Sequence, residues 1–119
     1  VLFSPEDIDL VFGPPSARRR YIDVLIAQTS QAYVRRLQEY NSVLRQRNAL
    51  LRGLHGSMPN DQELEVWDDA LASSGAEILK ARFLAVESLA PRIHQSFERL
   101  GDGFPFAIFF CGLGFAYDR

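Results

Sequence analysis

The sequence has 119 residues, of which 47% are hydrophobic and 24% are charged, and its formal net charge is −2. These values are typical of one globular domain, and the overall charge gives no indication of a nucleic-acid-binding protein. The single cysteine, Cys111, excludes an internal disulfide, and no apolar run is long enough to span a bilayer. We therefore expect a cytoplasmic protein without membrane contacts.

The first predicted element is a short helix within "VLFSPEDIDLVFGPP". Ser4 suits the N-cap, Pro5 suits the first helical position, and Asp7 can reach back to the start of the helix. The glycine and two prolines that follow are expected to end it. A second helix is predicted at about residues 16–28.

Two long helices are predicted next, on either side of the helix-breaking stretch "GLHGSMPN". Apolar side chains recur at heptad-like spacing in the first of them: Tyr33, Leu37, Tyr40, Leu44, Leu51 and Leu54. The second begins after Asn60 and extends to about Leu100, with bends or breaks expected at residues 73–75 and at Pro91. The short connection predicts an antiparallel pair with Trp67 buried between the helices.

The C-terminal segment is predicted to form two short strands, "FPFAIFF" and "GFAY". The expected fold is therefore mainly α: an antiparallel, coiled-coil-like pair of long helices with a short C-terminal β-hairpin or strand pair. Residues 106–111 are apolar on both faces of a strand, and unpaired edges of this kind recruit other chains. We accordingly expect a homo-oligomer, most simply a two-fold dimer.

The charges are segregated along the chain. Arginine dominates between residues 18 and 55, at Arg18, Arg19, Arg20, Arg35, Arg36, Arg45, Arg47 and Arg52, whereas every charge between residues 61 and 77 is acidic. An antiparallel pair brings the two groups together, and both also suit the helix dipoles. Mutual pairing is therefore favoured over a nucleic-acid footprint.

No catalytic or metal-binding motif is recognisable. The sequence lacks a phosphate-binding glycine loop, a metal-ligand spacing around its two histidines and a nucleophile elbow. One alternative function is a stand-alone helical adaptor that pairs with a partner helix. A remote alternative is a small all-α enzyme with a pocket lined by Arg18, Arg19 and Arg47, although no acid or base accompanies them at useful spacing.

Two charged groups near the start of the chain remain open to interpretation. The acids Glu6, Asp7 and Asp9 either stabilise the dipole of a first helical turn or contact magnesium or water in an adjoining site. The arginines 18–20 lie at a helix start, where the dipole disfavours cations. We expect them to pair with nearby aspartates or to meet an anion or a partner domain.

The stretch "PEDIDLVFGPPSARRRYID" resembles the signature of the RecF family of bacterial recombination mediators. The matching positions are Pro5, Glu6, Asp7, Gly13, Pro15, Arg18, Arg19, Tyr21 and Asp23. The resemblance continues through "YNSVLRQRNALLR" and, more loosely, through "VWDDALASSGAEILKAR".

The resemblance implies an internal piece of an SMC-like ABC ATPase. Residues 1–103 would form a helical arm lobe inserted in an ATPase head, with residues 1–15 as the junction and residues 104–119 as a β segment returning toward the head. Glu6 or Asp7 would then occupy a Q-loop-like position. The DNA-contact or partner-contact candidates are Arg18, Arg19, Arg35, Arg36, Arg45 and Arg47.

The resemblance also implies a division of labour between this piece and the whole protein. The whole protein would bind ATP and Mg²⁺, recognise gapped or junction DNA, and help to load RecA together with RecO and RecR in DNA repair, recombination, replication and the SOS response. The piece itself would be structural or interaction-mediating and not catalytic, and it would need no cofactor or metal.

Overall fold

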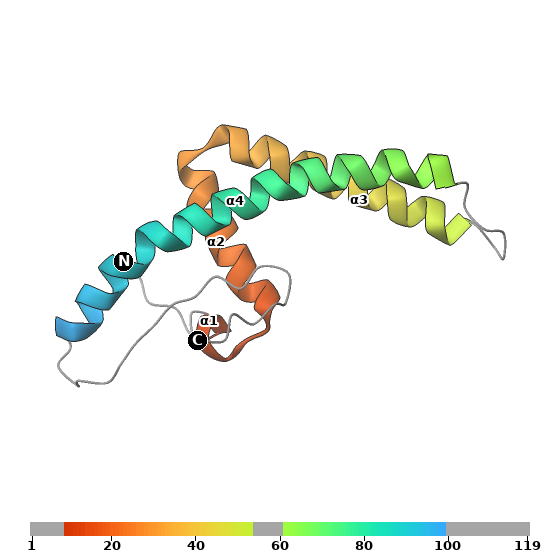
Figure 1. The fold of residues 1–119 in the computed structure, drawn as a ribbon. Helices are drawn as coiled ribbons and strands as arrows, with labels where there is room; N and C mark the ends of the chain where they lie inside the picture. Colours follow the sequence, from red (N-terminus) through yellow and green to blue (C-terminus); the bar gives the residue numbers. More distant parts are fainter. Residues whose placement is uncertain (1–8, 54–60, 100–119) are drawn as a thin grey trace. The chain divides into compact units, whose positions relative to one another are not determined.

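The computed structural model describes residues 9–53 and 61–99, and nearly all of them are helical (Figure 1). The helices are α1 (Asp9–Phe12), α2 (Pro15–Thr29), α3 (Gln31–Gly53) and α4 (Asp61–Arg99). This confirms the prediction of a mainly α fold for the described residues. The predicted C-terminal strands within residues 104–119 lie outside them, as do residues 1–8 of the proposed junction at residues 1–15, and Asn60, the expected N-cap of the last helix.

The helix boundaries follow the local sequence. α2 begins at Pro15, where a fixed φ angle and a missing N–H are both tolerated. Ser30 separates α2 from α3, and its hydroxyl accepts a hydrogen bond from the backbone N–H of Tyr33 at 3.2 Å. Ser30 is thus the N-cap of α3.

The prediction for residues 73–75 and Pro91 allowed either bends or breaks. α4 is one uninterrupted helix of 39 residues, so a break at either position is wrong. At the first of these positions, the Ser74 hydroxyl donates to the carbonyl of Ala70 at 2.7 Å and remains within the helix. A Cβ added at Gly75 would lie 3.3 Å from Cε2 of Tyr40 on α3. The glycine therefore permits close packing of the two helices at this point.

The chain divides into two compact units, and α4 contributes to both. The described residues of the first unit are 9–29 and 81–99, and those of the second are 30–53 and 61–80. In the second unit, α3 lies beside the N-terminal part of α4 (Figure 1). We call this second unit the hairpin.

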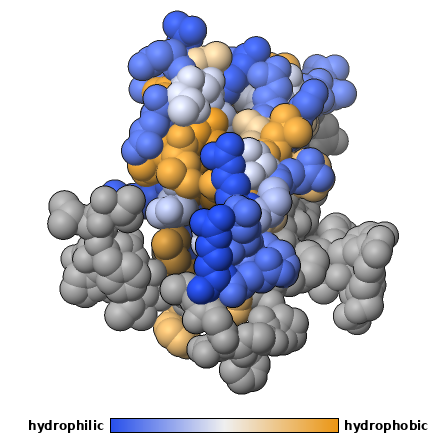
Figure 2. Space-filling model, turned by 90° about the vertical axis from the view of Figure 1, so that its left-hand side faces the viewer, coloured by the Kyte–Doolittle hydropathy of each residue, from blue (hydrophilic) through white to orange (hydrophobic). Residues whose placement is uncertain are grey.

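Few side chains are buried in the described part of the chain. Tyr33 and Ile78 in the hairpin and Val86 in the first unit are the buried apolar residues. Trp67 is only half-buried, because two helices cannot enclose so large a side chain. Apolar areas accordingly adjoin hydrophilic ones on the surface, as Figure 2 shows for one face of the molecule. No described helix combines the length and apolar character that crossing a membrane requires.

Candidate functional site

The arginine side chains of α3 divide into a paired group and an unpaired group. In the paired group, Arg36 on α3 contacts Glu77 on α4 at 2.6 Å, and Arg47 contacts Asp68 at 2.5 Å. A step of eleven residues along α3 thus corresponds to a step of nine in the opposite direction along α4. These contacts confirm the predicted antiparallel arrangement and, for Arg36 and Arg47 but not for Arg45 and Arg52, the predicted pairing of arginines with acids.

Arg36 also contacts Glu39 on its own helix, at 3.1 Å. The hydrogen bond to Glu39 and the nearby charge of Glu77 raise the pKa of Arg36 above its ordinary value. The guanidinium is held between two carboxylates, so its charge is neutralised locally. Arg36 is therefore a poor candidate for contacting an external anion.

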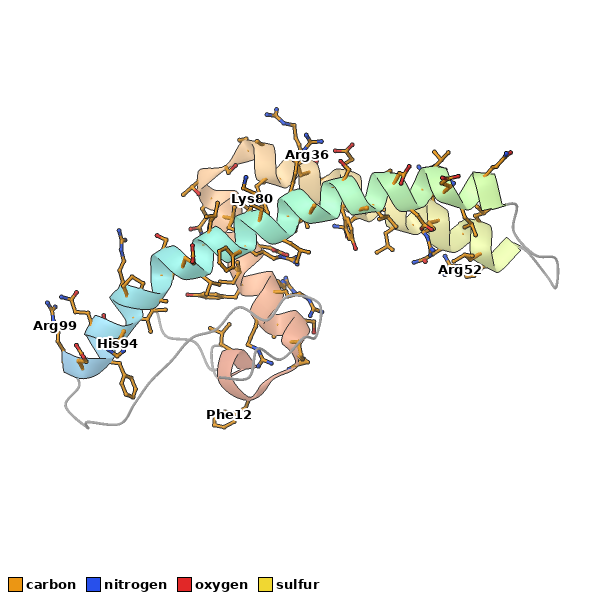
Figure 3. The ribbon with its side chains drawn as sticks, viewed as in Figure 1. Phe12, Arg36, Arg52, Lys80, His94 and Arg99 are labelled. Atoms are coloured by element: carbon orange, nitrogen blue, oxygen red, sulfur yellow. The ribbon has the colours of Figure 1, made fainter. Side chains whose placement is uncertain are left out.

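Three α3 arginines form the unpaired group: Arg35, Arg45 and Arg52. All three are exposed, and none has an ion-pair partner within the described ranges. Figure 3 shows Arg36 near the beginning of α3 and Arg52 near its end. The sequence grouped Arg35, Arg36, Arg45 and Arg47 as equivalent candidates, whereas the structure separates them by whether α4 supplies an acid.

The first unit contains an ion pair that sequence reasoning missed. Arg82 on α4 donates two hydrogen bonds to Asp23 on α2, at 2.7 and 2.8 Å. The side chains of Arg82 and Asp23 are only 15% and 16% exposed, so the pair is largely withdrawn from solvent. Since 59 residues separate the partners in sequence, no local pattern pointed to this contact.

Arg18 has a local role at the start of α2. Its guanidinium donates to the carbonyl of Gly13 at 3.0 Å, in the turn that joins α1 and α2. Arg19 and Arg20 are exposed on the same helix. The expected aspartate partners of residues 18–20 included Asp23, whose carboxylate instead accepts both hydrogen bonds from Arg82.

The other sequence candidates are less informative. Glu6 and Asp7 lie outside the described residues, so the structure does not test their Q-loop-like role. Arg18 belongs to the first unit, whereas Arg47 belongs to the hairpin and is engaged by Asp68. Within residues 9–53 and 61–99, no three His, Cys, Asp or Glu side chains lie close enough to hold a metal ion.

Comparison with known proteins connects these helices with one group of relatives. No family model matches the chain. The chain is 46% identical over 91 residues to the DNA replication and repair protein RecF of Herpetosiphon aurantiacus, a match that covers 75% of the chain and 24% of that protein. The RecF protein of Thermomicrobium roseum is 40% identical over 102 residues, and that of Heliobacterium modesticaldum is 45% identical over 100 residues.

The last two matches each cover 84% of the chain, and they cover 26% and 27% of the respective relatives. The chain therefore spans about a quarter of the length of the curated relatives it matches. Identities between 40% and 46% over three quarters or more of the sequence are far above what two unrelated helical chains share. The chain belongs to the RecF family.

Proposed function

We propose that this chain is a helical, non-catalytic lobe of a RecF-type DNA replication and repair protein. The observation that carries the proposal is the alignment with RecF proteins over 75–84% of the chain. The described helices also fit a supporting role, since the hairpin is held by contacts between its own two helices. The non-catalytic assignment follows from the sequence, in which no phosphate-binding glycine loop and no nucleophile elbow is recognisable.

The whole protein is proposed to bind ATP and Mg²⁺, to recognise gapped or junction DNA, and to help load RecA together with RecO and RecR. These properties are carried over from the family resemblance of residues 5–23. Glu6 and Asp7 are the residues of this chain that we propose to face the nucleotide site, in a Q-loop-like role. The lobe itself would need neither nucleotide nor metal.

The hairpin holds its two helices in a defined register. α3 and the facing part of α4 are joined by Arg36–Glu77 and Arg47–Asp68, and Gly75 allows the ring of Tyr40 to approach the α4 backbone. Ion pairs that are this exposed contribute little stability, but they fix which residues of the two antiparallel helices face each other. We therefore propose that the lobe acts by presenting fixed helix faces to the rest of its protein or to a ligand.

A segment exchange tests the proposal. The aligned segment of the Heliobacterium modesticaldum RecF protein is replaced by this chain, and survival after ultraviolet irradiation is measured in cells that depend on that protein. We expect the chimera to restore survival, while a chimera with an unrelated helical hairpin of equal length does not. Failure of the first chimera at normal expression, or success of the second, would contradict the proposal.

The absence of catalysis is tested separately on the 119-residue chain. We expect no ATP hydrolysis above the uncatalysed background, because residues for cradling phosphates and orienting water are not recognisable in this sequence. Sustained turnover that co-purifies with the chain and disappears in a Glu6→Gln or Asp7→Asn variant would assign catalysis to the chain itself.

A further inference from the structure

The unpaired arginines of α3 lie on a single outward stripe. Positions at alternating steps of four and three residues lie on one face of a helix. On α3 these positions are Gln31, Arg35, Gln38, Ser42, Arg45, Ala49 and Arg52, and all except Ser42 are exposed. We call this set the arginine stripe.

The arginine stripe lies away from the contact with α4. At 100° per residue, Arg45 is turned by about 160° from Arg47, which is paired with Asp68. The only acid on α3 is Glu39, and it is engaged by Arg36. The stripe therefore carries three positive charges and no negative charge, over a rise of about 26 Å from Arg35 to Arg52.

A partner helix is a poor match for this face. Heptad spacing supports a coiled coil only when the repeated positions are apolar, and here Ala49 is the one apolar residue of seven. Burying arginines and glutamines in such a seam would leave their donors without partners, which is costly. Pairing with a partner helix through the arginine stripe is accordingly disfavoured.

A linear polyanion matches the arginine stripe well. Arginine, glutamine and serine side chains are among the groups that hydrogen-bond phosphate oxygens, and such contacts remain hydrated. The repeated phosphates of a nucleic-acid strand also supply charge along the whole length of the stripe. We infer that the arginine stripe of α3 binds the phosphate backbone of nucleic acid without reading its sequence; the inference rests on the proposed function in DNA replication and repair.

The expected strength follows from the number of contacts. Three phosphate contacts give a slope of about −2.7 for the logarithm of affinity against the logarithm of salt concentration. Affinity should then fall about 40-fold between about 50 and 200 mM salt. Binding of this kind is weak near physiological salt, which agrees with the small net charge of the chain.

The test measures binding of the 119-residue chain to a fluorescein-labelled DNA duplex by fluorescence anisotropy, across that range of sodium chloride. The stripe variant combines Arg35→Gln, Arg45→Gln and Arg52→Gln. A matched control combines Lys80→Gln, Arg92→Gln and Arg99→Gln, which removes the same charge from other exposed positions. Circular dichroism verifies that the helical content of each variant is unchanged.

We expect the stripe variant to bind at least about tenfold more weakly at about 50 mM salt and to lose most of the salt slope, while the control keeps both. Replacing the three stripe arginines by lysine should retain the slope, because the charge is kept. Equal loss in the stripe variant and the control would overturn the inference, since net charge alone would then explain binding. Absence of binding by the unmodified chain at the lowest salt would overturn it too.

Two further outcomes separate the inference from its alternatives. In the first, polyglutamate competes with the labelled duplex as strongly as unlabelled DNA does, and this competition depends on the stripe arginines. That result would identify an acidic protein as the partner and overturn the inference. If the chimera restores survival but the chain does not bind DNA, the stripe assignment fails while the proposed function stands. If the chimera fails, the proposed function fails whatever the stripe binds.

Discussion

Removing either partner of the Asp23–Arg82 pair should strongly destabilise the first unit. The two hydrogen bonds of 2.7 and 2.8 Å form a bidentate contact, and both side chains are about 85% withdrawn from solvent. Unit charges about 4 Å apart attract by about 4 kcal/mol at an effective dielectric constant near 20. Deleting one partner loses this attraction and leaves the other charge desolvated, so Asp23→Leu or Arg82→Met should each lower the free energy of unfolding by about 3–5 kcal/mol.

The double variant gives the sharper result. Replacing both charges by apolar groups of similar size removes the desolvation penalty together with the attraction. Asp23→Leu with Arg82→Met should therefore lower the free energy of unfolding by less than about 2 kcal/mol. The measurement is urea unfolding followed by circular dichroism, with linear extrapolation to water. The corresponding control is Arg47→Met with Asp68→Leu at the more exposed pair of the hairpin, where we expect a change below about 1 kcal/mol.

The reasoning would be refuted if each single change at Asp23 or Arg82 cost less than about 1 kcal/mol, the value for an exposed pair. It would equally be refuted if the double variant cost as much as the sum of the two single changes, because the two residues would then act independently. Trp67 is the only tryptophan and lies in the hairpin, so its fluorescence reports whether the hairpin unfolds with the first unit.

Three other predictions concern separate parts of the chain. Gly75→Ala should stabilise the chain by up to about 1 kcal/mol if the ring of Tyr40 shifts by a few tenths of an ångström, and a lower urea midpoint would show that the ring is fixed. Ser30→Ala should lower the free energy of unfolding by about 1 kcal/mol in urea, because the backbone N–H of Tyr33 loses its hydrogen-bond acceptor. An unchanged free energy of unfolding would mean that water replaces the hydroxyl. Deleting residues 104–119 should shift the chain toward monomer in light scattering, and an unchanged mass would refute association through that segment.

The hairpin was predictable because its signals are periodic. Apolar residues at helical spacing, a break rich in glycine, and arginines facing acids all point to two antiparallel helices, and Arg47 does pair with Asp68. The periodicity does not define the rotation of each helix about its axis precisely enough to show which arginines face α4. Arg45 and Arg47 are two residues apart and therefore point in very different directions, so one meets the acids of α4 and the other does not.

The wrong and missed features have specific causes. A break is one of the two alternatives that residues 73–75 predict, because serine and glycine have low helix propensity, but packing of Tyr40 against Gly75 outweighs that preference. Pro91 costs one backbone hydrogen bond, and the remaining turns of α4 keep it helical. The pair of Asp23 and Arg82 depends on contacts between distant segments, which a single sequence does not show.

The antiparallel register of the hairpin has a consequence for how such a protein changes length during evolution. Seven residues make nearly two full turns, so inserting seven into α3 and seven at the matching level of α4 rotates each helix by only about 20°. The ion pairs on both sides of the insertion would then survive, and the hairpin would grow by about 10 Å. An insertion of one or two residues in a single helix would instead turn every side chain beyond it away from its partner. Related hairpins should therefore differ in length by paired steps of about seven residues.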